Sequence, residues 1–447
     1  MTYASSKDIK LDGQEPEIQW DISDGITLDA DIVGNNKNVP WYYYDDASHI
    51  NDGYIAKTKN VKILDDIIPE KTDYLFYNLR NVDNFEGLDR LLENSSKIGN
   101  YEFSYCQNLK NINVPLGVKE IGQSAFSACR VLESVNLSES VTSIKPAAFA
   151  SCSGLVTINF PKNVTVIEER MFYNCSSLKS ITISDLVTTI EKNAFEKCAA
   201  LEKIVLPSNL TIIENWTFSE CKALKEISFP NNLKMIGDRA FRSCKALKEI
   251  NFPNSLTTLG SSAFSACDLL VSIMIPATVT SIGPNPFSWC NSLESISVSS
   301  ENMVYNSKDN CNAIIETATN ILIAGCKNTI IPYGVTGIGE QALQGFSTIT
   351  EITIPDSVVT IGDNAFYDCS RLKEIVIPNS VTSLGESTFD YCYALESITI
   401  PESVTSIGRR VFRDCSSLKT ITIKKPEDSI TGAPWGAPST TEIIWDP

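Results

Sequence analysis

The side chains with the widest chemistry in this sequence are its fourteen cysteines. A cysteine can be a nucleophile, a metal ligand or half of a disulfide, and its spacing helps to distinguish these roles. Nine cysteines, from Cys106 to Cys290, follow one another at intervals of 23 residues, and three more, from Cys369 to Cys415, resume that interval. No Cys-x-x-Cys pair or zinc-like Cys/His pairing occurs, and neighbouring thiolates would repel one another. We therefore interpret these twelve cysteines as buried, unpaired thiols that act as small hydrophobic residues.

Other catalytic or metal-binding groups are scarce. The one histidine, His49, would have to carry any Ser/His/Asp or Cys/His site, and we interpret it as a solvated or capping residue. Asp29, Asp31 and Gly34 resemble the start of a calcium loop, but Pro40 stands where an EF-hand needs Glu. No standard nucleophile, phosphate-loop or zinc motif occurs. The sequence therefore predicts no catalytic residue, metal or cofactor and no enzyme, with a carbohydrate-active enzyme using paired carboxylates as a remote alternative.

Charge and hydropathy exclude further classes of function. The chain has 447 residues, with 37 basic and 54 acidic side chains, a formal net charge of −17. Nucleic-acid binding depends on clustered Lys and Arg, so neither nucleic acid nor an anionic membrane surface is an expected partner. No apolar run approaches the roughly 20 residues that span a bilayer, and MTYASSKDIK lacks the pattern of a secretory signal. We expect a soluble or already processed chain without membrane insertion.

The cysteines belong to a longer repeating unit, because other residue types keep the same interval. Leu stands three positions after each cysteine, from Leu109 to Leu418, and a further copy, IGEQALQGFSTITEITIP, has Leu343 and Phe346 in the Phe and Cys columns. The residue three positions before each cysteine is Phe: Phe103, Phe126, Phe149, Phe172, Phe195, Phe218, Phe241, Phe264, Phe287, Phe366, Phe389 and Phe412. Thirteen copies of a 23-residue unit indicate a solenoid rather than separate globular domains.

The unit V-T-x-I-G-x-x-A-F-x-x-C-x-x-L-x-x-I-x-I-P suggests how one coil folds. Its closing I-x-I alternates with period two and predicts a short strand that ends at Pro. The A-F-x-x-C-x-x-L stretch predicts one or two turns of α- or 3₁₀-helix, and V-T-x-I predicts a second extended segment. Stacked coils then pair their strands in parallel, with helical turns on the other face.

This unit resembles the leucine-rich-repeat superfamily, in particular the BspA-like, 23-residue repeats of bacterial and protist surface proteins. SVTSLGESTFDYCYALESITIP carries the resemblance, which covers about residues 99–424. It implies a leucine-rich-repeat solenoid with N- and C-terminal caps. It also implies a secreted or cell-surface, non-enzymatic protein for adhesion or protein binding.

Departures from the repeat divide the chain into four regions. Residues 1–60 form an acidic, aromatic-rich capping module, and 61–98 form a degenerate capping repeat whose Phe and Leu are four residues out of register. The solenoid, 99–424, contains a lengthened repeat at about 299–332. Residues 425–447 resemble the terminal cap of the family, and we expect Trp435 and Trp445 to contact the last coil.

Two cysteines lie outside the 23-residue column, in a segment of the lengthened repeat that resembles a hairpin. If Glu316 pairs with Ile321, then Cys311 faces Cys326. A cross-strand disulfide and two free thiols both fit this arrangement.

The outward residues of L-x-x-I-x-I offer the best candidate binding surface. They are small and mostly polar, which suits a broad contact with an extended partner but lacks the aromatic anchors of tight interfaces. Simple solubility of an exposed sheet explains them equally well. The candidates on this face are Asn113, Asn136, Asn159, Thr182, Lys203, Ser228, Glu226, Glu249, Asn251, Glu351 and Glu374. Near the N-terminus, Trp41, Tyr42 and Tyr44 either contact a ligand or cover the open end of the first coil.

The expected function is recognition of a host or neighbouring-cell protein or glycan through the repeat surface, by a protein outside the cell or on its surface. The alternative is a structural or receptor-reading appendage, such as part of a phage tail or surface layer. A monomer is favoured, although the sequence leaves the oligomeric state open.

Overall fold

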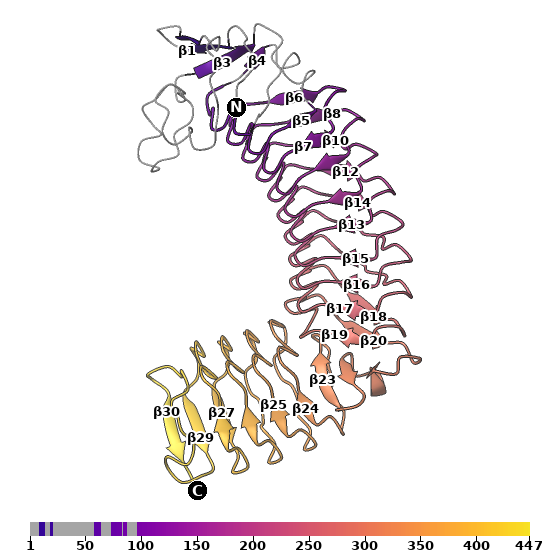
Figure 1. The fold of residues 1–447 in the computed structure, drawn as a ribbon. Coiled ribbons are helices and arrows are strands. Elements are labelled where there is room, and N and C mark those ends of the chain that lie inside the picture. Colours follow the sequence, from indigo (N-terminus) through magenta and orange to yellow (C-terminus); the bar gives the residue numbers. More distant parts are fainter. Residues whose placement is uncertain (1–8, 14–17, 21–57, 64–72, 83, 87–95) are drawn as a thin grey trace. The chain divides into compact units, whose positions relative to one another are not determined.

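The structure is a computed structural model that describes residues 9–13, 18–20, 58–63, 73–82, 84–86 and 96–447. The chain forms two compact units. Unit 1 runs to Ile213 and includes Thr217–Leu224, and unit 2 comprises Glu214–Trp216 and Lys225–Pro447. Each unit is a stack of short coils (Figure 1). Within the described residues, no helix is both long enough and apolar enough to cross a membrane.

A small sheet comes first in unit 1. Its strands are β1 (Ile9–Gly13), β2 (Ile18–Trp20), β3 (Thr58–Ile63) and β4 (Asn84–Glu86). Strand β1 pairs antiparallel with β2 and β3, whereas β3 and β4 are parallel. The predicted aromatic cluster Trp41, Tyr42 and Tyr44, together with His49 and the calcium-loop candidates at 29–34, lies outside the described residues.

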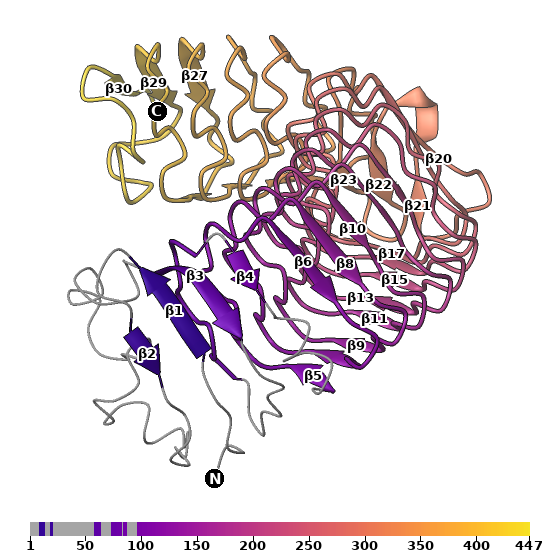
Figure 2. The ribbon, with the colours of Figure 1, turned by 90° about the horizontal axis from the view of Figure 1, so that it is seen from above.

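The predicted I-x-I strands form a parallel ladder. Figure 2 shows β6, β8 and β10 side by side, and each residue pairs with the one 23 positions later, as Asn113 does with Asn136. Unit 1 contributes β6 (Asn111–Val114), β8 (Ser134–Leu137), β10 (Thr157–Asn159), β12 (Ser180–Thr182) and β14 (Lys203–Val205). Unit 2 contributes β18 (Ser272–Ile275), β20 (Ser295–Val298), β27 (Ser397–Ile400), β29 (Thr420–Ile423) and β30 (Glu442–Trp445).

Three coils carry Phe in place of the second inward Ile, at Phe160, Phe229 and Phe252. The first of them keeps its strand, β10, whereas the segments that end at Phe229 and Phe252 are not strands. The Phe229 and Phe252 ring centroids are 6.1 Å apart.

The V-T-x-I segments form a second ladder of two-residue strands, as predicted. In unit 1 these are β5 (Lys97–Ile98), β7 (Glu120–Ile121), β9 (Ser143–Ile144), β11 (Val166–Ile167), β13 (Thr189–Ile190) and β15 (Ile212–Ile213). In unit 2 they are β16 (Met235–Ile236), β17 (Thr258–Leu259), β19 (Ser281–Ile282), β24 (Gly337–Ile338), β25 (Thr360–Ile361), β26 (Ser383–Leu384) and β28 (Ser406–Ile407).

The predicted helical turns are absent from the A-F-x-x-C-x-x-L segments of the described coils, which consist of successive tight turns. Backbone donors alternate in direction there. The N–H groups of Phe126 and Ala128 bind the next coil, at 2.8 and 2.7 Å, whereas those of Ser127 and Cys129 bind the carbonyl three residues earlier. Ser124 and Ala128 have φ of +52° and +60°. A left-handed residue at two points of most segments prevents the i to i−4 bonds of an α-helix, so the predicted α- or 3₁₀-helical turns are not confirmed.

The Phe, Leu and Ile columns form the core between the two ladders and the turns. Phe side chains from successive coils stack, with centroids 5.2–5.7 Å apart from Phe76 to Phe218 in unit 1. Phe76 belongs to the segment that is four residues out of register, and its stacking on Phe103 shows that 73–82 forms a coil of the same kind. In the further copy of unit 2, Leu343 and Phe346 are fully buried in the expected columns.

The lengthened repeat lies entirely in unit 2 and adds β21 (Tyr305–Asn306), the 3₁₀-helix η1 (Lys308–Asn310), β22 (Ile314–Glu316) and β23 (Ile321–Ala324). Strands β22 and β23 form the predicted hairpin, and β23 continues into the short-strand ladder beside β24. On the turn side the neighbouring coils meet directly, since Asn285 Nδ2 donates to the carbonyls of Gln341 and Ala342. The extra residues are therefore accommodated on the strand side alone.

The predicted contact of the C-terminal tryptophans with the last coil is present. Trp435 is buried, and its carbonyl accepts a hydrogen bond from the Phe412 N–H at 3.2 Å. Trp445 lies in β30, which pairs in parallel with β29 and leaves the ring half-buried.

Candidate functional site

In each unit, the candidate residues lie on the outer face of the I-x-I segments and their equivalents, which we call the strand face of that unit. In β6 the pattern is exposed, buried, exposed, buried, so Asn111 and Asn113 point outward while Ile112 and Val114 enter the core. The other candidates with described positions are also exposed: Asn136, Asn159, Thr182, Lys203, Glu226, Ser228, Glu249, Asn251, Glu351 and Glu374. The period-two prediction of inward and outward residues is thus confirmed, whereas a binding role for this face stays a prediction.

Asparagines form a regular row at the start of the strand face in unit 1. Asn113, Asn136 and Asn159 occupy equivalent positions of three paired strands, and the Asn159 amide donates to the Leu137 carbonyl at 3.3 Å. Beside them, the Ser134 hydroxyl donates to the Asn111 side-chain oxygen at 2.7 Å. Small side chains held at the strand spacing give this part of the face a flat, polar surface.

Apolar residues also occupy the strand face, at positions that our sequence analysis left out of the candidate site. Val205 in unit 1 and Met274 and Val376 in unit 2 are 63%, 65% and 78% exposed. Each stands between the two inward residues of its coil, so the period-two pattern of the sequence could have identified it as an outward residue. Exposed apolar side chains supply the desolvation energy that a polar surface lacks, so they add contact points to the site.

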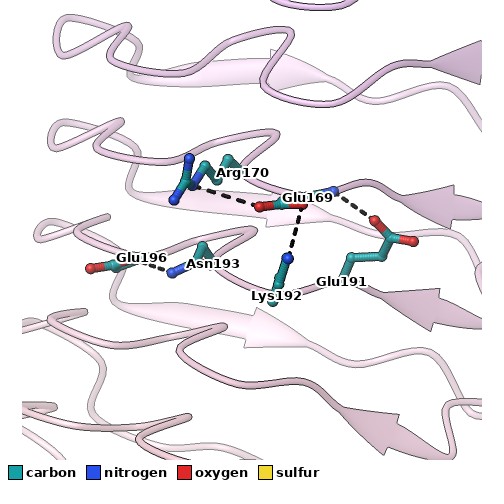
Figure 3. Close-up of polar contacts among 6 residues, drawn as sticks. All are labelled: Glu169, Arg170, Glu191, Lys192, Asn193 and Glu196. Atoms are coloured by element: carbon teal, nitrogen blue, oxygen red, sulfur yellow. Dashed lines mark hydrogen bonds and ion pairs between the residues drawn. The ribbon is translucent and has the colours of Figure 1, made fainter.

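Charged residues gather at the edge where the short strands turn into the tight turns, as Figure 3 shows for two coils of unit 1. Glu169 lies 3.3 Å from Lys192 Nζ and 3.8 Å from Arg170 Nε, and its N–H donates to Glu191 at 3.0 Å. Partial burial, and then the Glu191 carboxylate, raise the pKa of Glu168. Opposite charges nearly balance here, so this edge behaves as a solvated ion-pair network.

The cysteine column consists of buried thiols that are protonated at neutral pH. All fourteen cysteines are free and buried. Cys152 Sγ donates to the Phe126 carbonyl at 3.0 Å, and the same carbonyl accepts the Cys129 N–H at 3.2 Å. Burial raises the pKa of Cys152 to about 12. The interpretation as buried, unpaired thiols is confirmed, and the structure adds a donor role, because column thiols such as Cys152 and Cys415 donate to a carbonyl of the neighbouring coil.

Cys311 and Cys326 lie close together in the hairpin of the lengthened repeat. The predicted register holds where Ile315 pairs with Leu322, but a bulge then pairs Ile314 with Ala324. Both thiols are free in the structure, and burial raises the pKa of each. The disulfide between them stays a prediction for a chemical test.

Among the described residues, no group of three or more His, Cys, Asp and Glu side chains is placed to hold a metal ion.

Comparison with known families gives one assignment across most of the chain. The description "BspA type leucine rich repeat region" matches residues 69–202, 188–314 and 323–433. A comparison with curated proteins gives no match.

Two solved structures show what the coils resemble. A leucine-rich repeat protein from Bacteroides ovatus is 30% identical, covers 76% of this chain and 92% of its own, and has a TM-score of 0.48. A leucine-rich cell surface protein from Faecalibacterium prausnitzii is 29% identical, covers 79% of this chain and 83% of its own, and has a TM-score of 0.53.

Proposed function

Because the chain belongs to the family of BspA-type leucine-rich repeat proteins, we propose that it is a non-enzymatic binding protein of the cell surface or extracellular space. The similar solved structure from Faecalibacterium prausnitzii is of a cell surface protein, which supports this location. The ligand is a protein or glycan of a host or neighbouring cell, and the strand face is the contact surface.

The observation that carries this proposal is the composition of the strand face. A repeat array needs only inward residues to fold, yet the outward positions combine amide, carboxylate and apolar side chains in defined rows. Amide groups such as those of Asn113 and Asn136 can donate and accept hydrogen bonds, while Val376 and Met274 offer apolar contact. This mixture suits a broad interface with many modest contacts rather than one deep pocket.

Capture of partners from extracellular matrix and mucus tests the proposal. The full chain is immobilised, bound molecules are identified, and the affinity of each is measured. We expect a saturable partner whose binding weakens at least fivefold with Asn136→Arg or Val376→Arg, since a bulky cation disrupts a flat interface. Asn379→Arg is the matched control, because Asn379 is exposed but lies beyond the I-x-I segment, after Pro378.

The outcome discriminates among the alternatives. Binding that Asn379→Arg weakens as much as Val376→Arg would place the contact elsewhere on the molecule. A chain with no saturable partner would favour a structural appendage.

A further inference from the structure

A second surface, on the turn side of unit 2, carries a chain of aromatic rings. Trp289 contacts Tyr367 edge to face, with centroids 6.2 Å apart; Tyr367 contacts Tyr391 at 5.3 Å, and Tyr391 contacts Tyr393 at 5.9 Å. We call these four residues the turn-side aromatic patch. Tyr393 is 44% exposed, and the other three rings are partly exposed. The patch faces away from the strand ladder, so the strand face does not include it.

Residues of the two following coils fix the position of the Trp289 ring. Trp289 Nε1 donates to Asp368 Oδ2 at 3.1 Å, across 79 residues of sequence. The coil between them carries Gly345, which has φ of +79°, and a Cβ there would lie 2.4 Å from the Trp289 ring. A glycine is therefore required where the indole crosses the coil. Such an arrangement fixes the position of Trp289 before any ligand arrives.

Carboxylates outnumber cations around these rings. Arg413 is the cation, and it contacts Asp390 at 2.6 Å and Asp414 at 3.6 Å. With Asp368, three carboxylates face one guanidinium, a formal charge of 1 − 3 = −2. Asp390 is fully buried and is the carboxylate that Arg413 contacts most closely. At the rim of the patch, Asp368 is partly exposed and Asp414 is exposed.

Elsewhere on the turn side, the protein covers its own rings with cations from the next coil. Lys197 lies over Tyr173 at 5.2 Å in unit 1. In unit 2, Arg239 lies over Trp216 at 4.8 Å and Arg413 over Tyr391 at 5.1 Å. Among the described residues, no Lys or Arg lies over Trp289, Tyr367 or Tyr393. The residues 23 positions after the two tyrosines are Asp390 and Ser416, so the cation is replaced by an acid or a small polar residue.

We propose that the turn-side aromatic patch binds an exposed Arg or Lys side chain of a protein partner, between the ring of Tyr393 and the carboxylates of Asp368 and Asp414. Aromatic faces attract cations through the ring quadrupole, and the two rim carboxylates supply the opposite charge. The side chain would complete on these rings the contact that Lys197, Arg239 and Arg413 make within the chain.

Fluorescence anisotropy with a labelled Gly-Gly-Arg-Gly-Arg-Gly-Gly peptide tests the proposal on the full chain. Tyr393→Ala keeps the net charge and should weaken binding about three- to tenfold, whereas Tyr393→Phe keeps the ring and should bind as the original chain does. Circular dichroism confirms that each variant is folded. Tyr333→Ala, which removes an 81% exposed ring outside the patch, should leave the affinity unchanged.

Charge variants separate a specific site from general attraction to an acidic protein. Asp414→Asn should weaken peptide binding and its dependence on salt, while Asp356→Asn removes the same charge at an exposed position outside the patch and should have no effect. Equal effects of the two variants, or no effect of Tyr393→Ala, would overturn the proposal. Binding of a neutral oligosaccharide that Tyr393→Ala abolishes, with no affinity of the chain for the peptide, would identify the patch as a glycan site and overturn the proposal as well.

Discussion

At the scale of single residues, the cysteine column shows why one residue type recurs in twelve coils. The core position needs a small apolar side chain, which Ala or Val could also supply. The carbonyl of the Phe in the neighbouring coil still has a free lone pair, and Cys198 fills it by donating to Phe172 at 3.2 Å. A thiol combines both properties without the desolvation cost of a hydroxyl. This donor role depends on the turn geometry, so the spacing of the cysteines could not predict it.

The buried column predicts a thiol titration in two stages. Thiolates are the reactive form, and burial both raises their pKa values and blocks access of the reagent. In the native protein we expect none of the twelve column cysteines to react within minutes. In denaturant without reductant, all fourteen should react.

The same titration tests Cys311 and Cys326. If only twelve thiols react in denaturant and reductant restores the number to fourteen, the two cysteines form the disulfide instead of the free thiols of the structure. Rapid reaction of most cysteines in the native protein would contradict the buried column.

A second prediction at this scale concerns Glu168, whose pKa is raised in the folded protein. The folded state then binds more protons than the unfolded state just above pH 4.5, so stability falls as the pH rises through that window. Glu168→Gln removes the charge whose formation lowers the stability. It should therefore raise the melting temperature at pH 7 by about 1–2 °C, with little change at pH 4. Melting curves at the two pH values provide the measurement. An equal shift at both would assign the effect to packing rather than to charge.

At the scale of elements, the ladders could be predicted but the turns could not. The period-two alternation of β-branched residues fixes which side of β6 or β8 is buried, because only one register hides the Ile side chains. The spacing of Phe, Cys and Leu, by contrast, fits a helix as well as tight turns. The deciding factor is non-local: the N–H groups of Phe126 and Ala128 bind the next coil. A repeat in which each coil completes its neighbour's backbone hydrogen bonds does not need a helix.

The candidate surfaces were partly predictable for a similar reason. Outward positions of the strand face follow from period two, so the exposure of Asn113 or Val376 could be inferred from sequence. The turn-side aromatic patch could not, because Trp289 and Tyr367 come from coils separated by the lengthened repeat. Only the structure shows that this repeat leaves the turn side continuous.

Side-chain caps between coils give a third prediction. The Asp363 carboxylate accepts the Glu386 N–H of the next coil at 2.7 Å, where the turn would otherwise leave that donor to solvent. Asp363→Ala should lower the free energy of unfolding by about 1 kcal/mol, whereas Asp363→Asn keeps an acceptor and should lower it by less. Urea unfolding followed by circular dichroism measures both. Equal losses for the two variants would show that the charge, and not the hydrogen bond, is what stabilises the turn.

At the scale of the whole molecule, stability should be a sum of coil-to-coil contacts, because each coil packs mainly against its neighbours. The chain divides into two compact units, and each has its own columns of buried residues. Unfolding of such an array is not required to be a two-state process, so the melting curves and urea curves of variants are read as shifts against the original chain. Binding surfaces on different coils can therefore be altered with little effect on one another.

The last prediction follows from this one-dimensional design. Phe126 is fully buried, with its ring 5.3 Å from that of Phe103 and 5.4 Å from that of Phe149. Phe126→Ala leaves a cavity that should cost about 3–5 kcal/mol locally. In hydrogen exchange followed by mass spectrometry, peptides from the coils around residues 103–149 should lose protection, because their backbone donors bind one another across the coils. Peptides from the coils that contain Phe366, Phe389 and Phe412 should keep the exchange rates of the original chain. A uniform loss of protection along the whole chain would mean that the coils unfold as one cooperative unit, and that the nearest-neighbour description of the array is wrong.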